Sequence, residues 1–160
     1  MDAVELLTSD HDALRDLFRR FEQAVEAGDR DRQQELCRTI VAQLRLHTAV
    51  EEQVFYPAAR EASDEAETLV REGLEEHHVV DGLIDELGPL EPSDEAFAPK
   101  MTVLIENVEH HAEEEEQELF PELRERFGDQ RLARLGEALR QAKQRGASGG
   151  SEPAAPGGDA

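Results

Sequence analysis

The chain has 160 residues, a formal net charge of −21, 38% hydrophobic residues and a single cysteine, Cys37. This length allows one domain with one core, and the negative charge argues against binding nucleic acid or anionic membranes. One cysteine excludes an internal disulfide and a cysteine-based zinc site, so Cys37 is expected to be a buried structural thiol. No apolar run reaches the length of a membrane span, and no basic, apolar leader is present. A cytoplasmic protein without membrane contact is therefore expected.

The first two predicted helices carry apolar residues at spacings of three and four. A short apolar segment precedes a capping-box pattern at Ser9 and Asp12, where the first helix is expected to begin. That helix ends at Gly28. The second helix begins near Asp29, and Pro57 is expected to bend or end it.

A third predicted helix begins at Ser63 and ends before the loop 88–93, which is rich in glycine and proline. The fourth begins between Asp94 and Pro99 and continues to about Gly128. These elements predict an all-α fold: an up-down-up-down four-helix bundle with a short C-terminal fifth helix.

The C-terminal part of the chain changes in composition. Residues 129–145 form a shorter amphipathic pattern, which predicts the fifth helix. Residues 146–160 are rich in glycine, alanine, serine and proline, and we expect a disordered tail there. The expected division is thus a bundle domain over 1–128, a helix over 129–145 and a tail over 146–160.

Each of the four long helices carries a histidine where its apolar stripe should hold a residue such as leucine. Two of these histidines are followed one turn later by a glutamate on the same face. Burying imidazole and carboxylate groups costs several kcal/mol unless something neutralises them. Counted from the predicted turns, all these positions lie at one height in the bundle, to within about one helical turn. The six residues are His11, His47, Glu51, His77, His111 and Glu115.

This constellation predicts a metal site. Imidazole nitrogen with carboxylate oxygen suits Fe, Mn, Zn or Cu rather than Ca²⁺ or Mg²⁺. Six ligands are too many for one tetrahedral zinc, but they fit two metal ions bridged by Glu51 and Glu115, with an oxo, hydroxo or water ligand between them. Two iron ions are the expected occupants, with Mn or Zn as alternatives.

Several neighbours of these residues need separate interpretations. His78 and His110 lie off the apolar stripes and are expected to be solvated, although either could sit behind a ligand. Tyr56 either packs at the core boundary or approaches the metals. Four adjacent glutamates are expected on solvated faces, and Glu52 or Glu114 could instead contact a ligand; the four are Glu52, Glu113, Glu114 and Glu116.

Together these motifs resemble the hemerythrin-like, or HHE cation-binding, domain. The resemblance extends from Val4 to about Phe127. It rests on Asp10-His11-Asp-Ala-Leu14, His47-x-x-x-Glu51 with Phe55-Tyr56-Pro57, Glu76-His77 with Ile84 and Leu87, and His111-x-x-x-Glu115 with Leu119-Phe120-Pro121. It implies a non-haem di-iron centre in which the four histidines are terminal ligands and the two glutamates bridge.

The chain departs from the oxygen-carrying hemerythrins in two places. Those proteins have His-x-x-x-His on the third helix, whereas here Asp81 stands four residues after His77, and their five-residue His-to-Asp step is replaced by His111-x-x-x-Glu115. A missing nitrogen ligand leaves an open position, or a role there for Asp81, Tyr56 or water.

The departures make simple oxygen carriage a poor fit. The resemblance to bacterial proteins of this looser type implies a protein that binds or reacts with O2, peroxide or NO. It could be a sensor or binder, or an enzyme that consumes peroxide or NO. An iron-handling, ferroxidase-like protein is the alternative, but ferritin-like proteins use Glu-x-x-His pairs, and only Glu75-x-x-His78 has that spacing here. A structural bundle without metal is the fourth hypothesis. The sequence does not determine the oligomeric state.

Overall fold

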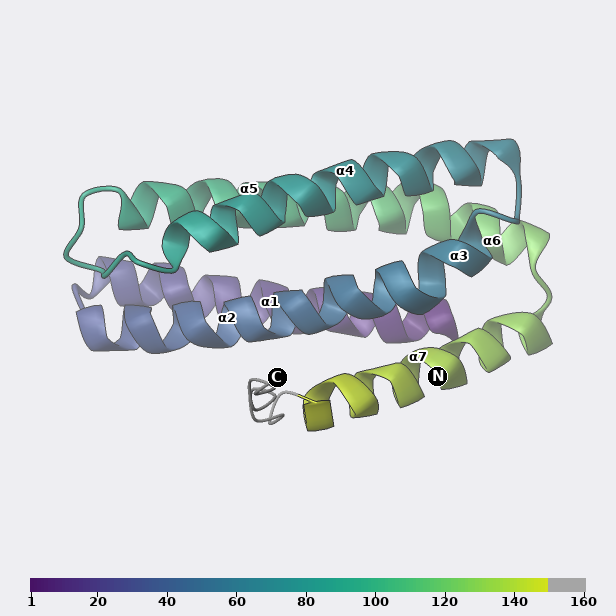
Figure 1. Ribbon diagram of the computed structural model, residues 1–160, viewed down its shortest axis with the longest axis horizontal. Coiled ribbons are helices and arrows are strands. Elements are labelled where there is room, and N and C mark those ends of the chain that lie inside the picture. Colours follow the sequence, from purple (N-terminus) through teal and green to yellow (C-terminus); the bar gives the residue numbers. More distant parts are fainter. Residues whose placement is uncertain (150–160) are drawn as a thin grey trace, which may run out of the picture.

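The computed structural model describes residues 1–149, and within that range the regular structure is entirely helical. The predicted all-α fold is confirmed. Four long helical segments lie side by side as a bundle, and a further helix lies against one side of it (Figure 1). The elements are α1 Ala3–Glu26, α2 Arg30–Val50, the π-helical turn η1 Glu51–Phe55, α3 Tyr56–Ala59, α4 Asp64–Leu87, α5 Phe97–Glu114, the π-helical turn η2 Glu115–Leu119, α6 Phe120–Arg126 and α7 Asp129–Gly149.

The first helix begins earlier than its sequence pattern suggested. The expected start at Ser9 is wrong, because the capping box is formed by Asp2 and Glu5: the Asp2 side chain accepts from the Glu5 N–H at 2.9 Å, and Glu5 accepts from the Asp2 N–H at 3.0 Å. Ser9 lies inside α1. Leu7, one turn before His11, is fully buried and extends the apolar stripe toward the N-terminus.

The remaining helix starts follow ordinary turn chemistry. Gly28 has a φ of 66°, which glycine adopts without strain, and it separates α1 from α2. Asp29 caps α2 through the Arg32 N–H, and Ser63 caps α4 through the Ala66 N–H. The positions expected for these two starts are confirmed.

The two prolines of the His-x-x-x-Glu helices do not end them. Each lies just beyond a π-helical turn that starts at the glutamate, and the N–H groups of Tyr56 and Phe120 donate to the carbonyls of Glu51 and Glu115. A π turn inserts one extra residue into the helix. As a result Tyr56 and Phe120 turn toward the same interior as the preceding glutamates, and both are buried.

The core consists of two apolar clusters, one on each side of the histidine level. One holds Leu7, Phe55, Val70 and Phe120 among others, and the second holds residues such as Phe18, Ile40, Ile84, Phe97 and Met101. Cys37 is buried in the second cluster as a free thiol, as expected. The polar layer between them is therefore enclosed by close-packed apolar side chains.

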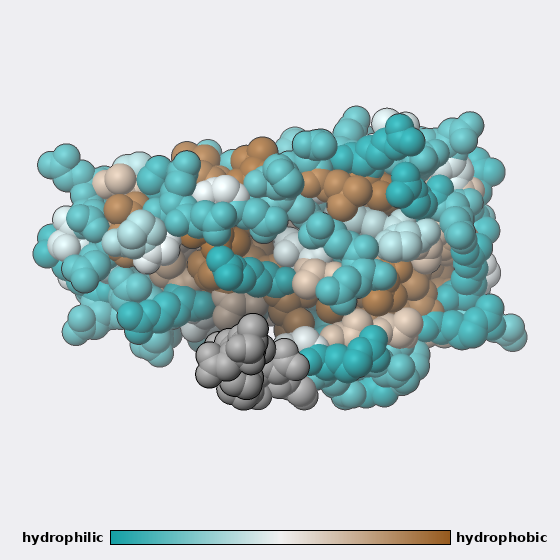
Figure 2. Space-filling model, viewed as in Figure 1, coloured by the Kyte–Doolittle hydropathy of each residue, from teal (hydrophilic) through white to brown (hydrophobic). Residues whose placement is uncertain are grey.

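Helix α7 packs against α1, α2 and η1 (Figure 1). It continues to Gly149, four residues past the expected end, and residues 150–160 of the predicted tail lie outside the described part of the chain. Hydrophilic residues cover most of the face seen in Figure 2, with hydrophobic side chains showing in the grooves between helices. None of the described helices is both long enough and apolar enough to cross a membrane.

Candidate metal centre

All six residues predicted to hold metal meet in the middle of the bundle. Each is at most 6% exposed, and Glu51 is completely buried. His11 comes from α1, His47 from α2 and His77 from α4, while Glu51 and Glu115 are the first residues of the two π turns and His111 lies near the end of α5. The predicted common height of these side chains is confirmed by their contacts.

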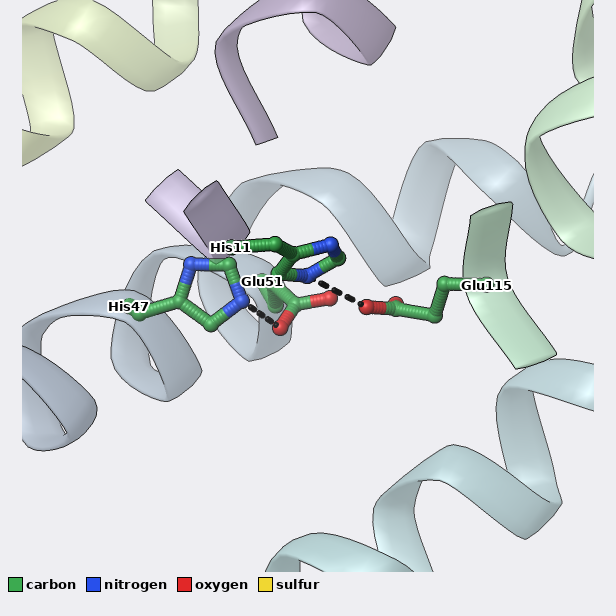
Figure 3. Close-up of side chains that lie close together, drawn as sticks. All are labelled: His11, His47, Glu51 and Glu115. Carbon is green, nitrogen blue, oxygen red and sulfur yellow. Dashed lines mark ion pairs between the residues drawn. The ribbon is translucent and has the colours of Figure 1, made fainter. Parts of the chain in front are cut away.

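The first group of donors, which we name position 1, consists of His11, His47, Glu51 and Glu115. One donor atom from each lies within 4.8 Å of all the others. The His47 Nε2 is 2.7 Å from the Glu51 Oε1, and the His11 Nε2 is 3.3 Å from the Glu115 Oε1. Figure 3 shows the two rings and the two carboxylates directed toward one another.

The second group, position 2, consists of Glu51, His77 and His111, again with donor atoms within 4.8 Å. The Nε2 atoms of the two histidines are 3.2 Å apart. Glu51 belongs to both groups, so a bridging role for it agrees with the geometry. Glu115 also lies near both, because its Oε1 is 3.3 Å from the Nε2 of His11 and of His111.

Tyr56 adds an oxygen donor at position 2. Its hydroxyl lies 3.3 Å from the His77 Nε2 and 3.1 Å from the His111 Nε2, and it donates a hydrogen bond to the Glu115 Oε2 at 3.0 Å. The side chain is 2% exposed. Of the two interpretations offered by the sequence, approach to the metal site is the one the structure supports.

The donor set lacks the hydrogen bonds that buried polar atoms normally make. Among the described residues, six buried side-chain atoms have no hydrogen-bond partner: the His11 Nδ1 and Nε2, the His47 Nε2, both Glu51 oxygens and the Glu115 Oε1. The His47 Nε2 and the Glu51 Oε1 are only 2.7 Å apart, but they do not form a hydrogen bond with each other. A cation at position 1 would neutralise these groups, so the residues present there fit a metal ion.

The pKa values of two histidines in the metal-free protein also indicate that this site favours positive charge. Burial opposes a charged imidazole, but the Glu51 carboxylate and Asp10 raise the pKa of His47 to about 10. The pKa of His111 also lies well above its usual value, because Glu115 outweighs the effect of burial. The carboxylates thus favour positive charge on these two rings, and metal binding would displace protons from them.

Each of the four central histidines turns its Nδ1 atom outward to a carboxylate. The partners are Asp10 for His47 at 3.1 Å, Glu52 for His77 at 3.1 Å, Glu76 for His111 at 3.2 Å and Glu116 for His11 at 3.7 Å. A carboxylate only accepts, so the Nδ1 atoms of His47, His77 and His111 donate to their partners, and their Nε2 atoms face the interior. Such partners fix the tautomer and raise the basicity of a metal-ligating histidine.

Sequence reasoning found part of this outer layer. The proposed contact of Glu52 with a ligand is present. Glu116 was expected on a solvated face, but it forms two hydrogen bonds with Arg15, at 3.0 and 2.6 Å, and lies beside His11. Asp10 and Glu76 belong to the sequence motifs but were not predicted to contact a ligand; each immediately precedes a histidine, and that spacing was the available signal.

Of the two side chains that the sequence offered for the open position, Tyr56 reaches the centre and Asp81 does not. Asp81 is exposed and lines a hollow of about 370 Å³ on the outside, together with Glu52 and Asp85. One turn before His77, buried Gly73 leaves room for the Tyr56 side chain. A Cβ atom built there would be 2.8 Å from the Tyr56 hydroxyl, so that hydroxyl occupies the place of a side chain.

The two remaining histidines stay outside the centre. His78 is exposed, and His110, 66% exposed, pairs with Glu114 at 3.1 Å. Both were expected to be solvated. Glu114 contacts no histidine of the centre directly; with Glu76 and His110 it forms a third, partly exposed group of possible ligands.

A small cavity adjoins the centre on the side of the second apolar cluster. Its volume is about 10 Å³, which is roughly what one water-sized molecule needs. The four predicted histidine ligands line it together with apolar residues such as Leu14, Leu44, Val80 and Val108. A small uncharged molecule would be held against the Nε2 atoms by apolar walls.

Comparisons with known proteins agree with this geometry. The model of the family described as "Hemerythrin HHE cation binding domain" matches residues 2–123. A curated protein from Nostoc sp. (strain PCC 7120), named "DNA nickase", is 25% identical over 145 residues, or 91% of this chain. The chain spans 40% of that protein's length. No solved structure is significantly similar.

Proposed function

The chain belongs to the hemerythrin HHE cation-binding family, and on that premise we propose that it is a non-haem di-iron protein that binds or reacts with O2, peroxide or NO. The observation that carries the proposal is a pair of buried donor groups that share Glu51, the first of which holds six buried side-chain atoms without hydrogen-bond partners. Family membership supports a cation site, and the donor chemistry supports iron among the cations.

In this proposal the histidines would be terminal ligands, two at each position, and Glu51 and Glu115 would bridge. Tyr56 would be an additional oxygen ligand at position 2, since its hydroxyl is as close to His77 and His111 as they are to each other. Bound iron would supply the redox chemistry that side chains lack. The protein would orient the rings through their Nδ1 carboxylate partners.

The cavity supports a small, uncharged reactant. Its walls are apolar apart from the histidines and Thr48, and its size excludes anything much larger than a diatomic molecule or peroxide. Water is kept out by the apolar clusters on both sides. These features favour a reactant that enters by diffusion through a packed bundle rather than a substrate that needs an open cleft.

The first experiment is metal analysis of the aerobically purified chain together with its ultraviolet-visible spectrum. We expect two iron ions per chain and charge-transfer absorption in the near ultraviolet. A colourless protein with one zinc would contradict the proposal. Oxygen release on addition of peroxide would then identify an enzyme, and a spectral change without turnover would identify a binder.

The activity in the name of the Nostoc protein need not be shared by this chain, which matches two fifths of that protein. A net charge of −21 opposes contact with phosphate backbones. We therefore expect no conversion of supercoiled plasmid to the nicked form by the purified chain. Nicking that is lost in His47→Ala would contradict this expectation.

A further inference from the structure

The two metal positions have matching inner layers but different surroundings. His11 and His77 each lie next to an aromatic residue that follows a π turn: the Phe120 ring is 5.9 Å from His11, and the Tyr56 ring is 5.3 Å from His77. At both positions the Nδ1 atom of each histidine also faces a carboxylate. The charged groups that surround these carboxylates can therefore be compared between the two positions.

Behind position 1, both outer carboxylates are paired with cations. Arg15 binds Glu116 through two nitrogens. Lys143 of α7 donates from its Nζ to the Oδ1 of Asp10, whose Oδ2 accepts from the His47 Nδ1 at 3.1 Å. Asp10, Lys143 and His47 line one pocket of about 300 Å³ between α1, α2 and α7.

Behind position 2, the charges have the opposite sign. Among the described residues, neither Glu52 nor Glu76 has an arginine or lysine within ion-pair distance. Asp81 stands four residues after His77, where Arg15 stands four residues after His11. Arg45 is near Glu52 but pairs with Asp85, at 3.7 Å.

We propose that Lys143 of α7 lowers the affinity of position 1 for a divalent cation by neutralising the carboxylate that orients His47. The proposal rests on the proposed function only in requiring that position 1 binds metal. A positive charge near the site repels the cation directly. It also makes Asp10 a weaker acceptor for the His47 N–H, so the ring donates less charge to the metal.

A consequence for α7 follows from linkage. This helix lies beyond residues 2–123, the part that matches the family. If Lys143 weakens metal binding at position 1, then metal at position 1 weakens the Lys143–Asp10 pair by the same factor. Helix α7 would thereby respond to whether position 1 is filled.

The test asks whether each of two substitutions in the full chain strengthens or weakens zinc binding. After metal removal, Zn²⁺ is titrated in competition with a chromophoric chelator. Lys143→Met should tighten one of the two binding steps, on the order of tenfold, whereas Asp10→Asn should weaken a step. A purely structural Lys143–Asp10 contact would make both substitutions weaken binding.

Matched variants separate this effect from a change in overall charge. Arg140→Met removes one positive charge from the same helix, at an exposed residue that pairs with Glu137, and should leave both steps unchanged. Lys143→Arg should behave like the unaltered chain. His77→Ala removes a ligand of position 2 and keeps position 1 intact, so in this background Lys143→Met should still tighten zinc binding. His47→Ala removes a ligand of position 1, so in that background Lys143→Met should have no effect. Circular dichroism checks that each variant is folded.

The outcomes are distinct for the two proposals. Uptake of fewer than two zinc ions by the unaltered chain would contradict the two-metal function. Two zinc ions with Lys143→Met equal to Arg140→Met, or with weaker binding, would overturn the role of Lys143 alone. If the His77→Ala chain does not fold, the opposite signs of Lys143→Met and Asp10→Asn in the unaltered background still decide the question.

Discussion

Gly73 offers the sharpest test of the packing around the centre. It lies inside α4, one turn before His77, where an alanine would ordinarily stabilise a helix by about 1 kcal/mol. A Cβ at this position would be 2.8 Å from the Oη of Tyr56, 3.2 Å from its Cζ and 3.3 Å from the Cε1 of His111. We expect Gly73→Ala to destabilise the protein despite its better helix propensity.

The expected loss of stability follows from the displacement of the Tyr56 side chain. Overpacking a filled core costs about 1–3 kcal/mol, and displacing Tyr56 breaks its hydrogen bond to Glu115, which leaves a buried acceptor at a further cost of about 1–3 kcal/mol. After subtracting the helix gain, we expect a net loss of about 1–5 kcal/mol. Gly82→Ala is the control, because Gly82 is in the same helix and a Cβ placed there would have nothing within 4 Å, so this variant should gain up to about 1 kcal/mol.

Urea unfolding followed by circular dichroism, with chelator present to remove metal, measures both free energies. We expect the free energies of unfolding of the two variants to differ by about 2–6 kcal/mol. We expect Tyr56→Phe to recover part of the loss when combined with Gly73→Ala. Equal stabilisation by Gly73→Ala and Gly82→Ala would show that the space beside Gly73 is not filled by Tyr56, and the reasoning about the open position would be refuted.

Three further predictions concern the metal centre. His47→Ala combined with His111→Ala removes one nitrogen from each position, and metal analysis should find less than one metal per chain; two retained metals would exclude these ligands. Tyr56→Phe should abolish a visible phenolate-to-iron absorption band of the ferric protein while leaving two irons bound, and a band that persists would place Tyr56 outside the ligand set. Burial lowers the pKa of His47, but Glu51 and Asp10 raise it to about 10. In the metal-free protein, protonated His47 therefore contributes its full stabilisation below pH 6.5, and this contribution is lost as the pH rises through about 10. Zinc binding at pH 7.5 should therefore release protons, measurable with an indicator dye, and should tighten as the pH rises from 6.5 toward 10; uptake without proton release would contradict the protonated state of the empty site.

The helices and the six candidate ligands were predictable because apolar spacing and polar exceptions to it are local properties of the sequence. His47 and Glu51 are one turn apart, and Asp29 and Ser63 are ordinary caps. The start at Asp2 was missed because two capping patterns compete near the N-terminus, and the longer apolar stripe through Leu7 decides between them. That choice depends on burial in the folded bundle.

The position of Tyr56 could not be predicted from regular helix periodicity. An uninterrupted α-helix would place Tyr56 on the opposite side from His47, whereas the π turn η1 adds one residue and brings it inward. The carboxylate partners of the Nδ1 atoms were also hard to predict, because each lies on a different element from its histidine and only packing brings them together, as for Asp10 and His47.

The paired π turns give the bundle two nearly interchangeable halves. After Glu51 the chain places Tyr56 against His77, and after Glu115 it places Phe120 against His11, with the same number of intervening residues. The two aromatic side chains differ by one oxygen atom. At these two equivalent places, the halves of the bundle therefore differ by a single hydroxyl group. Exchanging Tyr56 and Phe120 should move that hydroxyl from His77 to His11 and leave the backbone unchanged.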